Sequence, residues 1–175
     1  MLETNRLILR PVKREDAEAI YAYASDVETT RFVTFDTYKS MDDAYNSLDH
    51  FFLNRDPKVQ FEALAIVLKE NNKMIGTVDA SRIYRKDNVE VGYVLHKDYW
   101  NQGIMSEAMK TYCKWLFEEK GIRRIELTHV PVNTGSKRVA EKVGFVFEGD
   151  RRAFEKIDDA YVDMPYYSLL EGDLK

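Results

Sequence analysis

The chain has 175 residues, 45% of them hydrophobic, which suits one domain over residues 1–175 with a sizeable core. Its formal net charge is −4, and basic residues form no cluster beyond short pairs such as Arg151-Arg152, so we expect no nucleic-acid partner. No apolar run approaches the roughly 20 residues that span a bilayer, and the charged N-terminus lacks the apolar middle of a signal peptide. We therefore expect a cytoplasmic protein without a membrane partner.

The titratable residues predict no metal site. Cys113 is the single cysteine, and its helical spacing from Met109 and Leu116 indicates a core residue. The three histidines are far apart in sequence (His50, His96 and His129). Acidic pairs either attract a cationic substrate or solvate the surface (Asp42-Asp43 and Asp158-Asp159).

The first third of the chain predicts one strand and two helices. Residues 6–12 alternate apolar and polar side chains as a strand does, and Pro11 ends it. Residues 13–26 form an amphipathic helix, and residues 40–55 form a second one that Ser40 or Asp42 caps. The aromatic-rich segment 27–39 between them has no clear period.

The rest of the chain predicts six strands and two helices. Residues 61–70 and 74–85 form a hairpin, and residues 89–97 a further strand. Helices are expected over 106–121 and 133–145, each stopped by a glycine, with a strand over 122–130 between them and two final strands over 145–156 and 160–170. Antiparallel strands before a β–α–β–α–β section predict a mixed sheet of the α/β or α+β class.

The stretch YWNQGIMSEA, residues 99–108, precedes the expected central helix. The first amides of a helix have no partner within it, and the helix dipole favours negative charge there. A tight turn would let these amides converge on a pyrophosphate, with Gly103 permitting close approach and the Ser106 hydroxyl adding a donor (Gln102, Gly103, Ile104, Met105 and Ser106). The alternative is a capped helix in which Gly103 only turns the chain.

A second stretch, NTGSKRVAEKVGF, places Asn133 and Ser136 at the start of the next helix. Helix capping by Asn133 is the alternative to a functional role. Together the two stretches resemble the GCN5-related N-acetyltransferases (GNAT), in the branch of the ribosomal-protein alanine and serine N-acetyltransferases. TNRLILRPVKREDAEAIY, MIGTVDA, VEVGYVLHKDYWNQGIMSEAM, NTGSKRVAEKVGFVFEG and YYSLL carry this resemblance in order over essentially the whole chain.

Two departures from the family pattern stand out. The family's loop reads Gln/Arg-x-x-Gly-x-Gly/Ala, whereas here Trp100 stands first and Met105 last, a variant typical of this branch. The tyrosine that protonates the leaving thiolate in many relatives is replaced by Ala140, and the branch has a serine where Ser136 stands. The resemblance implies a mixed, mostly antiparallel sheet of about seven strands with about four helices, splayed between the fourth and fifth strands, 89–97 and 122–130.

The resemblance also implies acetyl-CoA as co-substrate, no metal, and direct attack of an amine on the thioester. Backbone groups of Val94 and Leu95 would hold the acetyl and pantetheine portions, the turn Gln102 to Ser106 the pyrophosphate, and Asn133 the pantetheine arm. Ser136 would protonate or stabilise the thiolate. The base is Glu155 in the last pair of strands or Glu90 on the fourth strand, and His96 is a lesser candidate.

The acceptor site is expected around residues 31–40 and the last hairpin. Four side chains would line it or attract an amine, although the aromatic ones also suit a core or dimer contact (Phe32, Phe35, Asp36 and Asp79). The acceptor would be a peptide N-terminus, such as that of a ribosomal protein, or a small amine such as a polyamine or antibiotic. A non-catalytic acyl-CoA-binding regulatory domain and a ligand-free structural domain are the alternatives, and a homodimer is possible.

Overall fold

The computed structural model describes residues 1–157 and 159–175, so Asp158 of the second acidic pair lies outside the described residues. Within these ranges eight strands form one sheet in the order β1-β2-β3-β4-β5-β6-β8-β7. The strands are β1 (Leu2–Glu3), β2 (Leu7–Pro11), β3 (Leu64–Leu68), β4 (Met74–Arg82), β5 (Asn88–Leu95), β6 (Arg124–Thr128), β7 (Val146–Ile157) and β8 (Ala160–Leu169). Neighbouring strands are antiparallel except β5 and β6, which are parallel.

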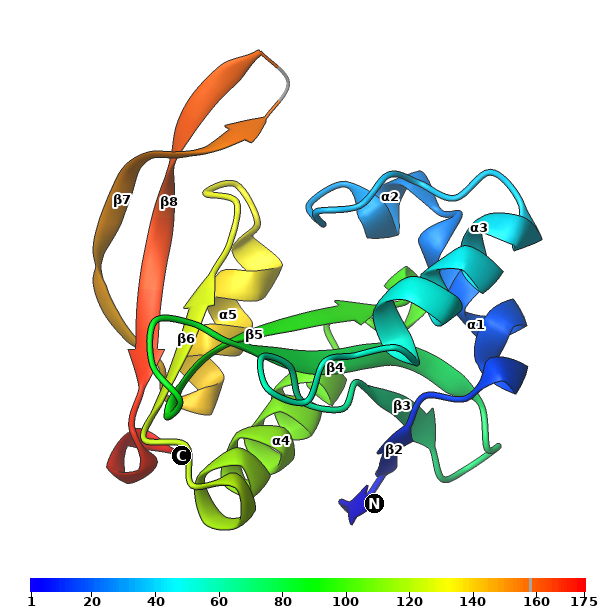
Figure 1. Cartoon of the computed structure of the whole chain (residues 1–175), viewed down its shortest axis with the longest axis horizontal. Helices are drawn as coiled ribbons and strands as arrows, with labels where there is room; N and C mark the ends of the chain where they lie inside the picture. Colours follow the sequence, from blue (N-terminus) through cyan, green and yellow to red (C-terminus); the bar gives the residue numbers. More distant parts are fainter. Residues whose placement is uncertain (158) are drawn as a thin grey trace.

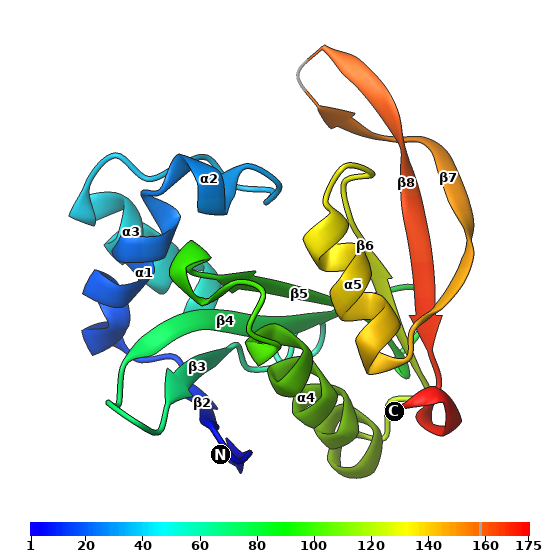
Figure 2. The same ribbon diagram turned by 180° about the vertical axis from the view of Figure 1, so that it is seen from behind.

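Helices cover both faces of this sheet (Figures 1 and 2). They are α1 (Ala17–Ala24), α2 (Val27–Thr30), α3 (Met41–Ser47), α4 (Ile104–Lys120) and α5 (Thr134–Val143), with a π-helical turn at Leu48–Phe52. On one face α4 and α5 lie against the sheet, and on the other α1, α2 and α3 gather over the β2–β4 side. On the face that carries α1, α2 and α3, no helix lies over strands β6, β8 and β7 in either view.

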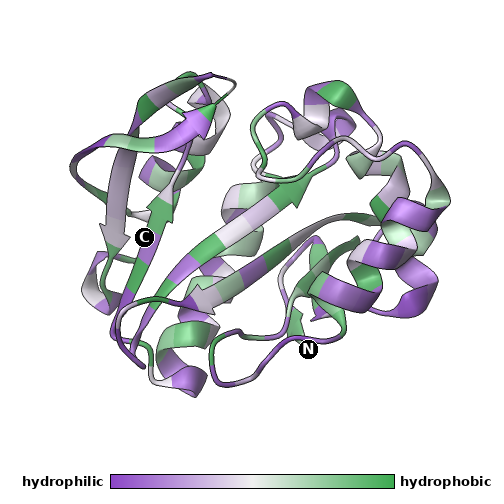
Figure 3. Cartoon of the chain, turned by 45° about the horizontal axis from the view of Figure 1, so that its top comes forward, coloured by the Kyte–Doolittle hydropathy of each residue, from purple (hydrophilic) through white to green (hydrophobic). Residues whose placement is uncertain are grey.

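The core divides along the same lines, because side chains of a strand alternate between the two faces. On the α4 side, Val89 and Val91 of β5 pack against α4 residues such as Met109, in a cluster that includes Cys113 as expected. On the α1 side, Ile20 and its neighbours cover β3. Figure 3 shows hydrophobic residues along the central strands and hydrophilic ones on the outer turns of the helices.

The sheet opens between β5 and β6. Asn88, Val89 and Glu90 pair with the first residues of β6, but β5 continues to Leu95 without a β6 partner. At the point of divergence, Thr128 Oγ1 donates a hydrogen bond of 2.7 Å to Glu90 Oε1. The expected splay is therefore confirmed, and it leaves one backbone edge of β5 open.

The architecture agrees with the expected mixed fold, with two additions. The two-residue strand Leu2–Glu3 makes eight strands where about seven were expected, because a pairing this short leaves no periodic pattern. The extra helix, α2, lies in the segment without a clear period, and Asp26 caps it by accepting a hydrogen bond from the Thr29 amide at 2.8 Å. Among the described residues, no helix has the length and apolarity to cross a membrane.

Candidate active site

The turn before α4 presents backbone amides that the helix does not use. Gly103, with φ of 74°, and Asn101, with φ of 58°, turn the chain into the helix through left-handed conformations. The first hydrogen bond of α4 runs from the Glu107 amide to the Gly103 carbonyl at 3.0 Å. The amides of Ile104, Met105 and Ser106 come before this bond and so have no acceptor within the helix. No described side chain caps the helix at Gly103. Successive amides in such a turn favour an anion.

Arg6 braces this turn from the N-terminal segment. Its Nη1 donates to the Gln102 carbonyl at 3.0 Å, and its Nε donates to Glu107 Oε2 at 2.7 Å. Thr4 Oγ1 donates to the other carboxylate oxygen of Glu107. Burial by itself would raise the pKa of Glu107, but the hydrogen bonds from Thr4 and Arg6 outweigh it and lower that pKa. The carboxylate therefore stays ionised and anchors the first turn of α4.

The open edge of β5 leads from this turn to the splay. The His96 amide donates to the Ile75 carbonyl at 2.9 Å, so this opposed pair is hydrogen-bonded across β4 and β5. Since hydrogen-bonded pairs alternate in an antiparallel ladder, Val94 bonds to β4, whereas the backbone groups of Tyr93 and Leu95 face the gap. The Trp100 indole N–H donates a hydrogen bond of 2.8 Å to the Leu95 carbonyl. Of the predicted pair, Leu95 therefore offers its amide to the gap and Val94 does not.

Ser136 lies in the first turn of α5 across the splay. Asn133 Oδ1 accepts a hydrogen bond from the Ser136 amide at 3.0 Å, so Asn133 is the cap of this helix. The buried Ser136 Oγ lies 2.6 Å from the hydroxyl of Tyr93 on β5. Burial raises the pKa of the Tyr93 phenol above its ordinary value. Tyr93 was missed in the sequence, although its place in an otherwise apolar set of alternating β5 residues left a hydroxyl in need of a partner.

The two candidate bases occupy very different places. Glu90 lies where β5 and β6 diverge, directly opposite Glu126 of β6, and its side chain is partly exposed. Because side chains alternate along β5, Glu90 lies on the face opposite Tyr93. Glu155 is exposed and pairs with Val162 close to the end of the β7–β8 hairpin, which projects beyond the rest of the sheet (Figure 1).

Asp79 lies beside the open part of β5. Its Oδ2 comes within 3.2 Å of where a Cβ on Gly92 would stand, so this close approach depends on the glycine. Arg55 Nη2 lies 3.2 Å from Asp79 Oδ1, and the Arg55 side chain is 5% exposed. Burial raises the pKa of Asp79, and Arg55 opposes that shift. The two residues form a largely buried ion pair on the face that carries Glu90.

The remaining acceptor candidates lie on the α1 side. Phe35 packs against the α1 core and its ring centroid lies 5.4 Å from that of Tyr38, as the core alternative proposed. The Arg31 guanidinium lies 5.1 Å from the ring centroid of Phe32. Asp36 is exposed. The structure places these three residues in the segment between α2 and α3.

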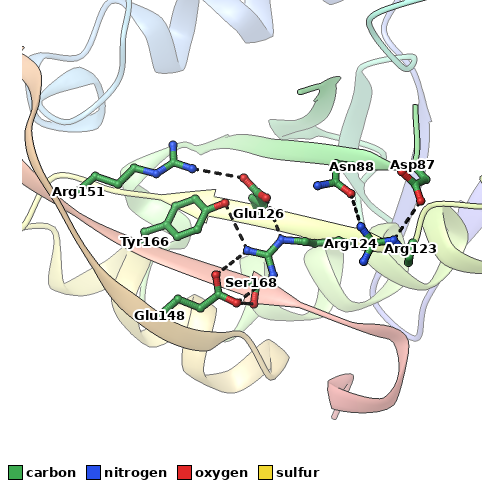
Figure 4. A network of polar contacts seen from close by, with 9 residues as sticks. All are labelled: Asp87, Asn88, Arg123, Arg124, Glu126, Glu148, Arg151, Tyr166 and Ser168. Carbon is green, nitrogen blue, oxygen red and sulfur yellow. Dashed lines mark hydrogen bonds and ion pairs between the residues drawn. The ribbon is translucent and has the colours of Figure 1, made fainter. Parts of the chain in front are cut away.

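A charged network lines the uncovered face of β6, β8 and β7 (Figure 4). Arg124 bridges Glu126 at 2.8 Å and Glu148 at 2.9 Å, and Arg151 lies 3.6 Å from the Tyr166 ring centroid. Glu126 is 2% exposed and also faces Arg151 at 3.5 Å. No pattern in the sequence predicts this network, because its members come from three strands. Among the described residues, no group of His, Cys, Asp and Glu is arranged to hold a metal ion.

Comparison with known proteins agrees with this geometry. A family model described as an acetyltransferase (GNAT) domain matches residues 6–146. An uncharacterized N-acetyltransferase of Bacillus licheniformis, p20, is 30% identical over 175 residues, which cover 98% of this chain and 97% of the relative.

Two solved structures share the fold. A ribosomal-protein-S5-alanine acetyltransferase from Vibrio fischeri is 26% identical, covers 99% of this chain and 97% of its own, and has a TM-score of 0.79. A ribosomal L7/L12 alpha-N-protein acetyltransferase (RimL) in complex with coenzyme A is 20% identical, with 95% of each chain covered and a TM-score of 0.84. The chain therefore belongs to the GNAT acetyltransferase family, as an N-acetyltransferase with relatives named ribosomal-protein acetyltransferases.

Proposed function

We propose that this acetyltransferase takes its acetyl group from acetyl-CoA and passes it to a primary amine by direct attack on the thioester. One observation carries the proposal: the open edge of β5 runs between the free amides before α4 and the buried hydroxyl of Ser136. An extended donor with an anionic end and a thioester matches this order of groups. The amides suit the pyrophosphate, the strand edge suits the amide-bearing arm, and a hydroxyl suits the sulfur.

The donor contacts follow from the backbone. The turn Gln102, Gly103, Ile104, Met105 and Ser106 holds the pyrophosphate mainly through amides, and the left-handed Gly103 sets their direction. The Leu95 amide and the Tyr93 backbone pair with the pantetheine arm as a missing strand would. The Asn133 side-chain oxygen already caps α5, so its amide nitrogen is the group left for the arm.

The reaction needs a neutral amine, a donor for the carbonyl oxygen and a donor for the sulfur. Bound acetyl-CoA supplies the activated carbonyl. Ser136 provides the hydroxyl for the sulfur. Glu90 accepts the amine's proton through a water molecule, because it lies at the mouth of the splay, partly exposed and held by Thr128. Glu155 remains the alternative base.

The acceptor amine approaches from the face that carries Glu90. That face is polar, with Asp79 on β4 diagonal to Glu90 and Glu126 on β6 directly opposite it. Similar proteins are named as acetyltransferases of ribosomal proteins S5 and L7/L12, so a protein N-terminal amine is the first acceptor to test. A small amine is the second, since the Glu90 carboxylate also suits a cation.

The test is release of the CoA thiol from acetyl-CoA, followed against peptides with the N-termini of ribosomal proteins S5 and L7/L12, and against polyamines and aminoglycosides. Each peptide is paired with a copy whose N-terminus is blocked. Thiol release and a mass gain of one acetyl group with the free peptide alone support the N-terminal acceptor. Acetylation of the small amines alone moves the assignment to them, and no acetylation of any amine overturns the proposal.

Three further expectations stay predictions: a single domain over residues 1–175, a homodimer, and a cytoplasmic location. Limited proteolysis tests the first, and sedimentation of the purified chain tests the second. Cell fractionation tests the third.

A further inference from the structure

The hydroxyls of Tyr93 and Ser136 form a hydrogen-bonded pair at the splay. They lie 2.6 Å apart, and either oxygen can be the donor. Each hydroxyl carries one hydrogen, and a single hydrogen bond uses one of the two. One O–H of the pair therefore always remains to be donated elsewhere.

The tyrosine determines how this pair behaves. A serine hydroxyl can otherwise donate to a nearby backbone carbonyl, which would withdraw its hydrogen from the site. Tyr93 offers a nearer partner and fixes Ser136 Oγ toward β5. Since burial raises the pKa of Tyr93, its phenol keeps its proton throughout the pH range of an enzyme assay. Two hydrogen-bonded hydroxyls also polarise each other, so the remaining O–H is a stronger donor than a lone serine.

We propose that Tyr93 is a positioning residue for thiolate departure: it holds Ser136 Oγ so that one hydroxyl of the pair donates to the leaving sulfur. This inference rests on the proposed function. The amine nitrogen bonds to the carbonyl carbon, and the carbon–sulfur bond breaks with its electron pair going to sulfur. The pair donates a hydrogen bond to that thiolate and loses no proton. The amine's proton passes through Glu90 to solvent, and solvent protonates the released thiolate.

The arrangement accounts for the absence of a hydroxyl on the inner face of α5 one turn later. Ala140 is fully buried and packs in the core of the α4 side, so that position of α5 cannot donate. The phenol instead comes from β5 and reaches the site through Ser136. Donation to the leaving sulfur then depends on two hydroxyls, one from strand β5 and one from the first turn of helix α5.

The first test compares Tyr93→Phe, Ser136→Ala and the double variant by steady-state kinetics. Tyr93→Phe keeps the ring and is expected to lower kcat about tenfold, the effect of one hydrogen bond, with the KM for acetyl-CoA within about twofold. The double variant should be no slower than Ser136→Ala, because both changes remove one unit. Tyr112→Phe is the matched control, since Tyr112 is a buried tyrosine of the same core whose hydroxyl donates to the Glu62 carbonyl at 3.4 Å.

The second test needs no turnover. The thiol pKa of bound CoA is read from thiolate absorbance in the ultraviolet during a pH titration. Tyr93→Phe should raise that pKa by about half a unit to one unit, because a donor to the thiolate is lost or weakened. Ring-fluorinated tyrosine at position 93, a more acidic phenol of nearly the same shape, should lower it.

The outcomes separate the two proposals. If the wild type binds CoA but acetylates no amine, the proposed function fails, and the bound thiol pKa still decides the role of Tyr93. If the wild type turns over and Tyr93→Phe matches it in kcat and in thiol pKa, the inference is overturned. A loss in Tyr93→Phe that adds fully to that of Ser136→Ala also overturns it, because independent effects would show that the two hydroxyls do not act together.

Discussion

Arg6 and Glu107 form an ion pair of 2.7 Å that ties the N-terminal segment to the first turn of α4. The same guanidinium also holds the Gln102 carbonyl. Arg6 thus fixes both ends of the turn that presents the free amides, although it lies about a hundred positions earlier in the sequence. A residue far from the family's loop in sequence therefore contacts that loop at both ends.

Arg6→Ala should raise the KM for acetyl-CoA about fivefold and change kcat less, because the turn loses charge-assisted hydrogen bonds worth about 1 kcal/mol and relaxes. The measurement is initial rate against acetyl-CoA concentration. Arg14→Ala is the control, since Arg14 pairs with Asp49 on the exposed α1–α3 side. An unchanged KM in Arg6→Ala would show that the turn keeps its shape without the brace.

Most of the fold could be predicted from local pattern. Strand alternation, the stop at Gly121 and the stop at Gly144 fix elements over a few residues each, and the structure has helices that end at both glycines. The two-residue β1 and the four-residue α2 could not be predicted, because each spans about one period of its element and a periodic pattern needs several. Helix α4 also begins at Ile104 rather than Ser106, since Gly103 in a left-handed conformation starts it earlier.

The site also has parts that local pattern predicts and parts that it does not. The turn before α4 and the Asn133–Ser136 spacing are contiguous in sequence, so a pattern could find them. Tyr93 could not be assigned to Ser136 that way, because the contact joins a strand to a helix that follows another strand. Only one member of the Arg55–Asp79 pair could be predicted, for the same reason. Asp79 lies on an expected strand, whereas Arg55 comes from the irregular segment before β3.

The two candidate bases can be separated by matched substitutions. Glu90→Gln keeps the shape and the hydrogen bond from Thr128 but removes the proton acceptor, so kcat should fall about 100-fold. Its rate should then follow only the deprotonation of the amine as pH rises. Glu155→Gln should stay within about twofold of wild type, because that side chain is exposed near the outer end of the hairpin. The reverse pattern in a pH–rate comparison would assign the base to Glu155.

The buried Arg55–Asp79 pair should be sensitive to removal of one partner. Asp79→Ala leaves a guanidinium that is 5% exposed without its carboxylate, at a cost of about 3 kcal/mol in unfolding free energy. Replacing both residues, as Arg55→Met with Asp79→Ala, should cost less than the single change, because no uncompensated charge remains. Urea unfolding of the three proteins measures this order. A double variant less stable than Asp79→Ala would contradict it.

Glu148 should make part of the stability depend on pH. The hydrogen bond from Arg124 is the main cause that lowers the pKa of Glu148 from 4.5 to about 2 in the folded chain. A carboxyl group with a lowered folded pKa stabilises the fold above its unfolded pKa, and that contribution is lost as pH falls toward the folded value. The advantage of wild type over Glu148→Gln should therefore be constant near neutral pH and shrink between pH 4.5 and about 2.

The effect should be small, because the Glu148 side chain is 39% exposed and solvent screens its ion pair. Unfolding by urea at a series of pH values measures it, with Glu119→Gln, an exposed glutamate of α4, as control. If the wild type and Glu148→Gln lose stability in parallel as the pH falls, the carboxylate of Glu148 does not hold the β6, β7 and β8 network together. If the stabilities of the wild type and Glu148→Gln converge at acid pH, the carboxylate does hold the network together, since the protonated carboxyl can no longer pair with Arg124.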